Sequence, residues 1–108
     1  MQLQVLIGIE YVHRKQIVHC DLKPSNIVFF GADLRWKLID FDMARKANKY
    51  RATSFTAAYA APEALKEFYR EGNLPLARPS LDLWSFGIIA YEVITGRWNF
   101  FYCHAAEG

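Results

Sequence analysis

The segment 81–95 most constrains what this chain can fold into, because it predicts a helix with almost no polar face. Apolar side chains fall on every side of it: Leu83, Trp84, Phe86, Ile88, Ile89, Tyr91, Val93 and Ile94. Ser80 is placed to cap its first turn and Gly96 to end it. A helix that is apolar all round must be surrounded by protein. With 108 residues in total, we expect this helix to need more packing partners than the remaining sequence supplies.

Two other regions have a recognisable pattern. Near the amino terminus, apolar residues at helical spacing predict a helix whose apolar stripe consists of Leu3, Leu6, Ile7 and Tyr11. Residues 27–30 and 36–39 read as two short strands, and the turn residues at 31–33 join them into a hairpin.

Proline and glycine divide the rest of the chain. Residues 17–19 are expected to be extended, since Pro24 disfavours helix just before it. Residues 40–61 are polar, basic and without periodicity, which predicts a long loop. Pro62 suits the first turn of a short helix, and a second loop is marked by Gly72, Pro75 and Pro79.

Composition narrows the function classes. Net charge is +2 and the basic residues are scattered, apart from a group at 45–51, so we expect no nucleic-acid partner. The apolar runs are too short for a membrane span, and the amino terminus lacks the basic region of a signal peptide. Two cysteines make no disulfide framework. We therefore expect a soluble, intracellular, cytoplasmic protein without a membrane partner.

The residues with the most specific chemistry lie in the loop 19–26 and directly after the second predicted strand. The loop contains a carboxylate, an ammonium and a carboxamide, from Asp21, Lys23 and Asn26, and Asp40 follows the strand. Phosphoryl transfer needs a carboxylate to orient a hydroxyl, a cation for phosphate oxygens, and oxygen ligands for magnesium. Asn26 and Asp40 offer such ligands from either side of the hairpin. The alternative is that these side chains merely cap turns.

The same residues resemble the catalytic core of the protein kinase superfamily. His19, Asp21, Leu22, Lys23, Pro24 and Asn26 match its catalytic loop, and the Lys-Pro pair is typical of the serine/threonine branch. Residues 40–42 resemble the metal motif, residues 56–63 the end of the activation segment (40–63), and residues 81–87 the start of the central helix of the large lobe. The resemblance implies an α+β, kinase-like fold. The chain 1–108 would be a fragment of the mainly helical C-terminal lobe, with a β-hairpin that carries the metal motif.

By resemblance, the catalytic residues are Asp21, Lys23 and Thr56. Asp21 would be the catalytic base, Lys23 would contact the γ-phosphate of ATP, and Thr56 would brace both. Asn26 and Asp40 would hold Mg²⁺ and, with Lys23, the nucleotide.

The resemblance also implies supporting roles. Val28 would lie under the adenine ring, His19 would pack near Phe41, and Asp82 would anchor the backbone of the catalytic loop. The partners implied are ATP and a protein, as substrate or as binding partner.

Two positions depart from the family pattern. Cys20 replaces an arginine that binds an activation-loop phosphate in many kinases, and we expect its thiol to be unreactive beside Asp21. Asp42 replaces a glycine, which reaches backbone angles that a residue with a Cβ reaches only at a cost, although aspartate is among the more tolerant residues. Its carboxylate either adds a metal ligand or repels Asp40.

Three functions remain open. The first is a segment of a serine/threonine kinase whose parent domain transfers phosphate from ATP to protein hydroxyls. The sequence has no glycine-rich phosphate loop, strand lysine or partner glutamate, so we expect the 108 residues by themselves to be inactive. The second is a non-catalytic, pseudokinase-type interaction module that presents apolar faces to a partner. The third, a small-molecule phosphotransferase, is disfavoured by Lys23-Pro24 and by the sequence at 61–63.

The hydroxyls of the loop, Thr53, Ser54 and Thr56, are either phosphorylation sites or part of a plain solvated loop.

Overall fold

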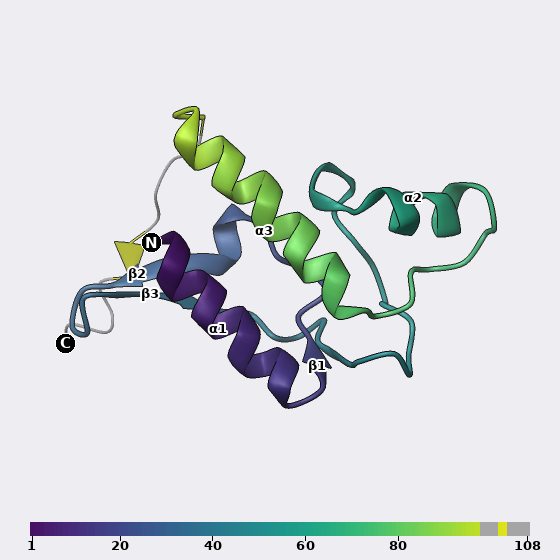
Figure 1. Cartoon of the computed structure of the whole chain (residues 1–108), viewed down its shortest axis with the longest axis horizontal. Helices are drawn as coiled ribbons and strands as arrows, with labels where there is room; N and C mark the ends of the chain where they lie inside the picture. The colour runs from purple at the N-terminus through teal and green to yellow at the C-terminus, as the bar shows by residue number, and fades with distance from the viewer. Residues whose placement is uncertain (98–101, 104–108) are drawn as a thin grey trace.

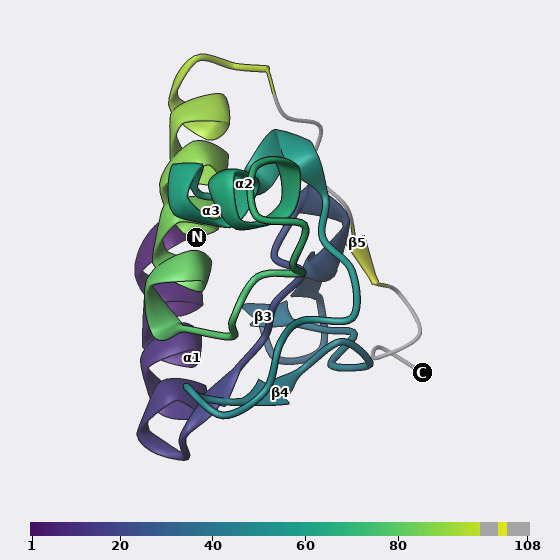
Figure 2. The same ribbon diagram turned by 90° about the vertical axis from the view of Figure 1, so that its right-hand side faces the viewer.

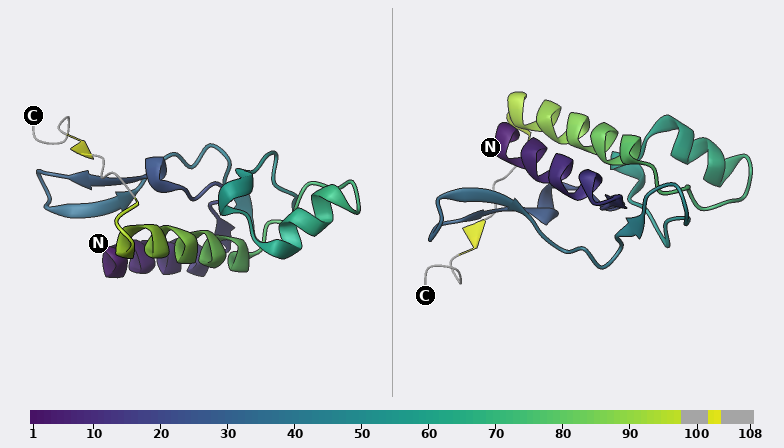
Figure 3. Two further views of the ribbon diagram at one scale, coloured as in Figure 1. Left: turned by 90° about the horizontal axis from the view of Figure 1, so that it is seen from above. Right: turned by 60° about the horizontal axis from the view of Figure 1, so that its bottom comes forward.

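The computed structural model describes residues 1–97 and 102–103. Two long helices, α1 (Gln2–Arg14) and α3 (Pro79–Ile94), lie side by side and run in opposite directions (Figure 1). A small sheet and the loops that connect it lie against one side of this helix pair (Figure 3). A shorter helix, α2 (Pro62–Tyr69), projects beyond the pair. The architecture is therefore α+β with helices predominant, as the sequence predicts.

The hydrophobic core lies where the two helices meet the sheet. Val5 and Ile9 of α1 and Ile89 of α3 are each 1% exposed, and they pack with Leu22 and Ile27. Leu22 follows the first short strand and Ile27 begins the hairpin. Burial of these side chains therefore fixes the loop between them, residues 19–26, against both helices.

The predicted apolar stripe of α1 is wrong. Leu3 is 71% exposed and Ile7 and Tyr11 are more than half exposed, whereas the buried face is that of Val5 and Ile9. The helix has apolar residues on two faces, and periodicity alone does not choose between them. The buried face is the one that carries Val5 and Ile9, four residues apart. It packs against the hairpin and α3, and these contacts decide which face of the helix is covered.

The hairpin is confirmed. Strand β2 (Ile27–Phe30) pairs antiparallel with β3 (Arg35–Leu38), and Ile27 lies opposite Leu38. Leu34 takes the left-handed conformation, φ 53°, in the turn that joins the strands. β3 begins and ends one residue earlier than predicted. A short strand, β5 (Tyr102–Cys103), pairs parallel with β2. It lies on the opposite side of the molecule from α1 (Figure 2).

The loop predicted over residues 40–61 contains structure that the sequence does not indicate. Strand β4 (Arg45–Lys46) pairs antiparallel with β1 (Ile17–Val18), and a 3₁₀ turn, η2, covers Ala57–Tyr59. A second 3₁₀ turn, η1, covers Pro24–Asn26. A two-residue strand whose partner is distant in sequence shows no local period, which explains why the pattern reads as loop.

The ends of α3 correct one expectation and confirm another. Ser80 does not cap the helix: Arg78 is the N-cap and Pro79 is the first helical residue, where its fixed φ suits the helix and its missing N–H costs nothing. At the other end Gly96 has φ 72° and donates to Val93 O, while Arg97 N donates to Glu92 O. These two bonds form the glycine-dependent helix stop expected at Gly96.

Much of the apolar surface of α3 lies open in this chain. Leu83, Trp84 and Tyr91 are each close to half exposed, and Ile94 is 76% exposed. This finding fits the expectation that the helix needs more cover than these residues provide. In the part of the chain that the structure describes, no helix combines the length and apolar character needed to cross a bilayer.

Candidate active site

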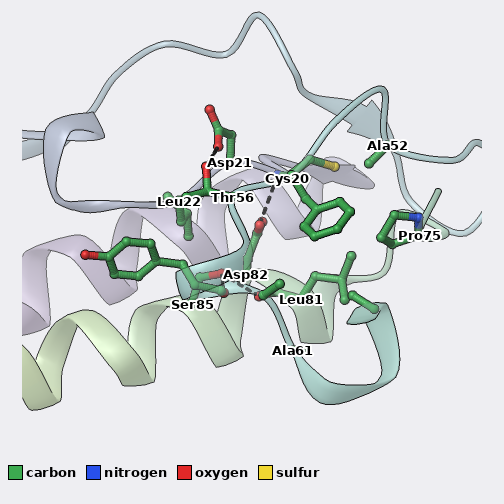
Figure 4. Close-up of a pocket in the computed structure, with 14 residues that line it drawn as sticks. Cys20, Asp21, Leu22, Ala52, Thr56, Ala61, Pro75, Leu81, Asp82 and Ser85 are labelled. Atoms are coloured by element: carbon green, nitrogen blue, oxygen red, sulfur yellow. Dashed lines mark hydrogen bonds between the residues drawn. The ribbon is translucent and has the colours of Figure 1, made fainter. Parts of the chain in front are cut away.

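The candidate catalytic loop, residues 19–26, begins directly after β1, and the carboxylate of Asp21 contacts the segment proposed as the activation segment, residues 40–63. Thr56 Oγ1 donates a hydrogen bond to Asp21 Oδ1 at 3.1 Å (Figure 4). The other carboxylate oxygen of Asp21, Oδ2, lies 3.5 Å from Lys23 Nζ. Three residues proposed from the sequence as catalytic, two of them 35 positions apart, are therefore in one cluster.

Asp82 of α3 binds the backbone of this loop. It is 1% exposed, and its two oxygens accept hydrogen bonds from His19 N at 2.8 Å and Cys20 N at 3.1 Å. His13 Nε2 of α1 lies 2.8 Å from Asp82 Oδ2. The expected anchoring of the loop backbone by Asp82 is confirmed, and His13 is a partner that sequence reasoning missed.

His19 has a structural position. Its Nδ1 accepts a hydrogen bond from Asp21 N at 3.2 Å, so Nε2 carries the proton and donates to Ile39 O at 2.9 Å. The His19 ring also lies 4.8 Å from the Phe41 ring, centre to centre, which confirms the expected packing. His19 thus connects the catalytic loop to the segment that carries Asp40.

Asn26 and Asp40 lie at the same end of the hairpin. Ile39 N donates to Asn26 O at 2.9 Å, so Asn26 pairs with the residue just before Asp40. Asn26 is buried, and its Nδ2 donates to Asp21 O at 2.7 Å. Because the amide nitrogen is used in this way, the side-chain oxygen of Asn26 is the atom left to bind a cation.

Asp42 does not take a backbone conformation that is costly for a residue with a Cβ. In this motif the left-handed conformation belongs to Asp40, with φ 61°, and Asp42 is not among the described residues of positive φ. Aspartate is one of the residue types that tolerate this region. Asp42 N donates to Asp40 Oδ1 at 3.4 Å, a long contact. An aspartate in place of glycine is therefore accommodated at position 42 without a left-handed backbone.

Cys20 is poorly suited to react. Burial, followed by the negative charge of Asp82, raises the pKa of its thiol to about 12. The thiol lies 3.5 Å from Val18 O, to which it donates. A thiol with this pKa is un-ionised at neutral pH, which supports the expectation of an inert side chain.

A small cavity of about 30 Å³ lies beneath the loop, lined by residues that include Cys20, Asp21, Thr56 and Ser85 (Figure 4). It has room for a water molecule or two and is far smaller than a nucleotide pocket. Val28, on β2, is buried and does not line it.

One charged cluster was not found from the sequence. Glu67 of α2 is 8% exposed and forms ion pairs with Arg51 at 3.1 Å and Arg78 at 2.7 Å. No local signal marks it, because its partners lie 16 and 11 positions away in irregular segments.

The antiparallel helix pair, the hairpin with its adjoining acid, and the catalytic loop held by a buried aspartate define an α+β lobe of the kinase type. A protein-family model described as "Protein kinase domain" matches residues 1–107. The chain belongs to the protein kinase family.

Its relatives include serine/threonine kinases. It is 38% identical over 96 residues to serine/threonine-protein kinase SBK1 of Danio rerio, covering 87% of this chain and 24% of that protein. It is 39% identical over 103 residues to serine/threonine-protein kinase D2 of Homo sapiens, covering 90% of this chain and 11% of that protein. The chain thus spans a quarter or less of these relatives.

Proposed function

We propose that the native polypeptide carrying these residues transfers the γ-phosphoryl group of ATP to serine or threonine hydroxyls of proteins. The observation that carries this proposal is the cluster of Asp21, Lys23 and Thr56, in which one carboxylate contacts both a cation and a hydroxyl. Its serine/threonine relatives support the substrate class.

Asp21 is proposed as the base. It accepts the proton of the substrate hydroxyl while that oxygen bonds to the γ-phosphorus and ADP leaves with the electrons of the broken P–O bond. Lys23 neutralises charge on the transferred group. Thr56 holds Oδ1 of Asp21, and Oδ2, which faces Lys23 at 3.5 Å, is the oxygen proposed to accept the proton of the incoming hydroxyl.

The donor set at the end of the hairpin fits magnesium. Asn26 would offer an amide oxygen and Asp40 an exposed carboxylate, which are the hard oxygen ligands that Mg²⁺ prefers. Magnesium would neutralise charge on the phosphates of ATP. We propose Val28, buried on β2, as part of the surface beneath the adenine ring.

The test is phosphate transfer from γ-labelled ATP to a peptide mixture rich in serine and threonine, with the full native polypeptide and Mg²⁺. We expect labelled phosphoserine or phosphothreonine, abolished by EDTA. The 108 residues alone are expected to show no saturable ATP binding. Micromolar binding by them would contradict that expectation, and absence of transfer by the full polypeptide would contradict the kinase proposal.

The exposed apolar residues favour a second candidate, a non-catalytic interaction module. Trp84 and Ile94 on α3, and Leu3 on α1, are large and open to solvent. This function predicts stable partner binding without phosphate transfer, and unchanged binding when Asp21 is replaced by asparagine.

A further inference from the structure

Glu67 is a buried carboxylate that joins three separate segments. Its Oε2 accepts from Arg51 Nη1 at 3.1 Å and from Leu76 N at 3.3 Å, while its Oε1 accepts from Arg78 Nη1 at 2.7 Å. Arg51 also donates to Leu74 O at 2.7 Å. We call these contacts the Glu67 clamp, formed by Glu67, Arg51, Arg78 and the backbone N–H of Leu76.

The electrostatics favour an ionised carboxylate. Burial by itself raises the pKa of Glu67, but the hydrogen bonds from Arg78, Leu76 and Arg51 outweigh it and lower the pKa. The hydrogen bond to Glu67 in turn raises the pKa of Arg78. Charge-assisted hydrogen bonds to a shielded group are stronger than exposed ion pairs.

The clamp fastens the middle of the activation segment to the loop before α3. Next to Arg51, Ala52 N donates to Pro75 O at 2.7 Å, and Ala77 N donates to Tyr50 O at 2.9 Å. These backbone bonds form one short antiparallel contact, the bridge between Arg51 and Leu76. Glu67 pairs with Arg51 within this contact and with Arg78 just after it.

The clamp is also connected to the catalytic cluster at both ends. Arg78 is the N-cap of α3, four residues before Asp82, which holds the catalytic loop. Arg51 precedes Thr56, the partner of Asp21, by five residues. Movement of the segment at Arg51 would therefore alter the position of Thr56.

We propose that Glu67 is a positioning residue that holds the activation segment against the start of α3, and so sets the Thr56–Asp21 contact for turnover of protein substrate. The kinetic part of this inference rests on the proposed kinase function, whereas the clamp itself does not.

The test compares Glu67→Gln with Glu71→Gln in the full native polypeptide. Glutamine keeps the shape of Glu67 but cannot bind two arginines as an anion. Glu71 is exposed and also affects the pKa of Arg78, yet its carboxylate forms no hydrogen bond with the described residues, so it controls for charge alone. Hydrogen exchange measured by mass spectrometry reports on the amides of Ala52 and Ala77, and steady-state kinetics report on turnover.

For Glu67→Gln we expect exchange at Ala52 and Ala77 to rise at least about tenfold, with that of Ile9 in the core unchanged. We expect kcat to fall about tenfold and the KM for peptide to rise, while the KM for ATP stays within about twofold. Glu71→Gln should leave all these values within about twofold.

Three outcomes would overturn the inference. They are unchanged exchange at Ala52 and Ala77, increased exchange throughout the core, or local loosening with normal kinetics. If the unmodified polypeptide transfers no phosphate, the kinase proposal fails, and the exchange measurement still decides whether the clamp holds the segment.

Discussion

The Oδ2 atom of Asp82 lies 2.8 Å from the backbone nitrogen of His19, a residue 63 positions earlier in the chain. The apolar helix α3 thereby places one buried carboxylate, that of Asp82, against the loop that carries Asp21. A helix that is otherwise a core element thus determines the geometry of the candidate active site.

Replacement of Asp82 by alanine should destabilise the protein by about 3 kcal/mol, because two backbone N–H groups and His13 lose their acceptor in a buried setting. Urea unfolding of the native polypeptide measures this. Asp33→Ala, at an exposed turn, is the control and should have a much smaller effect on stability. Equal effects of the two changes would contradict the anchoring role.

Asp21→Asn should lower phosphate transfer by about a thousandfold or more with little change in ATP affinity, because the amide cannot accept the hydroxyl proton. Transfer rates and nucleotide binding by calorimetry check both parts. Asp33→Asn should leave both unchanged. Normal turnover of Asp21→Asn would remove Asp21 from the mechanism.

Thr56→Ala should lower kcat about tenfold, because Asp21 loses the hydroxyl that fixes one of its oxygens. Thr56→Ser keeps that hydroxyl and should retain most of the activity. Steady-state kinetics distinguish the two variants. An equally large loss of kcat in Thr56→Ser would show that the methyl group of Thr56, and not its hydrogen bond, matters.

Cys20 should react slowly with iodoacetamide. With its pKa raised from 9.0 to about 12, the thiolate fraction at pH 8.5 is about a thousandfold smaller than in an unfolded chain. Because the folded state favours the protonated thiol, Cys20 contributes to the stability of the folded protein. This contribution is complete below pH 9 and is lost as the pH rises towards 12. Peptide mapping after timed alkylation, with and without urea, measures it; equal rates would contradict burial of the thiol.

Asp42→Gly should lower magnesium affinity, because the site loses a carboxylate whose negative charge attracts the cation beside Asp40. Asp42→Asn removes the same charge and should have the same effect as Asp42→Gly, since Asp42 has no positive φ that glycine would relieve. Magnesium titrations of transfer activity test both. Unchanged affinity in both variants would show that Asp42 neither binds the cation nor attracts it.

The sequence alone determined the local features. The hairpin, the short helix after Pro62, the stop at Gly96 and the spacing of Asp21, Lys23, Asn26 and Asp40 all follow from short-range patterns. These features depend on neighbours in the chain, through turn residues, proline and periodicity, so they can be recognised without a fold.

Only the tertiary structure decided which surfaces meet. It selected Val5 and Ile9 over the stripe of Leu3 and Ile7, and it paired β4 with β1 across a loop that shows no period. It also closed the Glu67 clamp. The physical reason is that burial and ion pairing depend on residues distant in sequence, whereas local pattern carries only what each segment can form, not what it will contact.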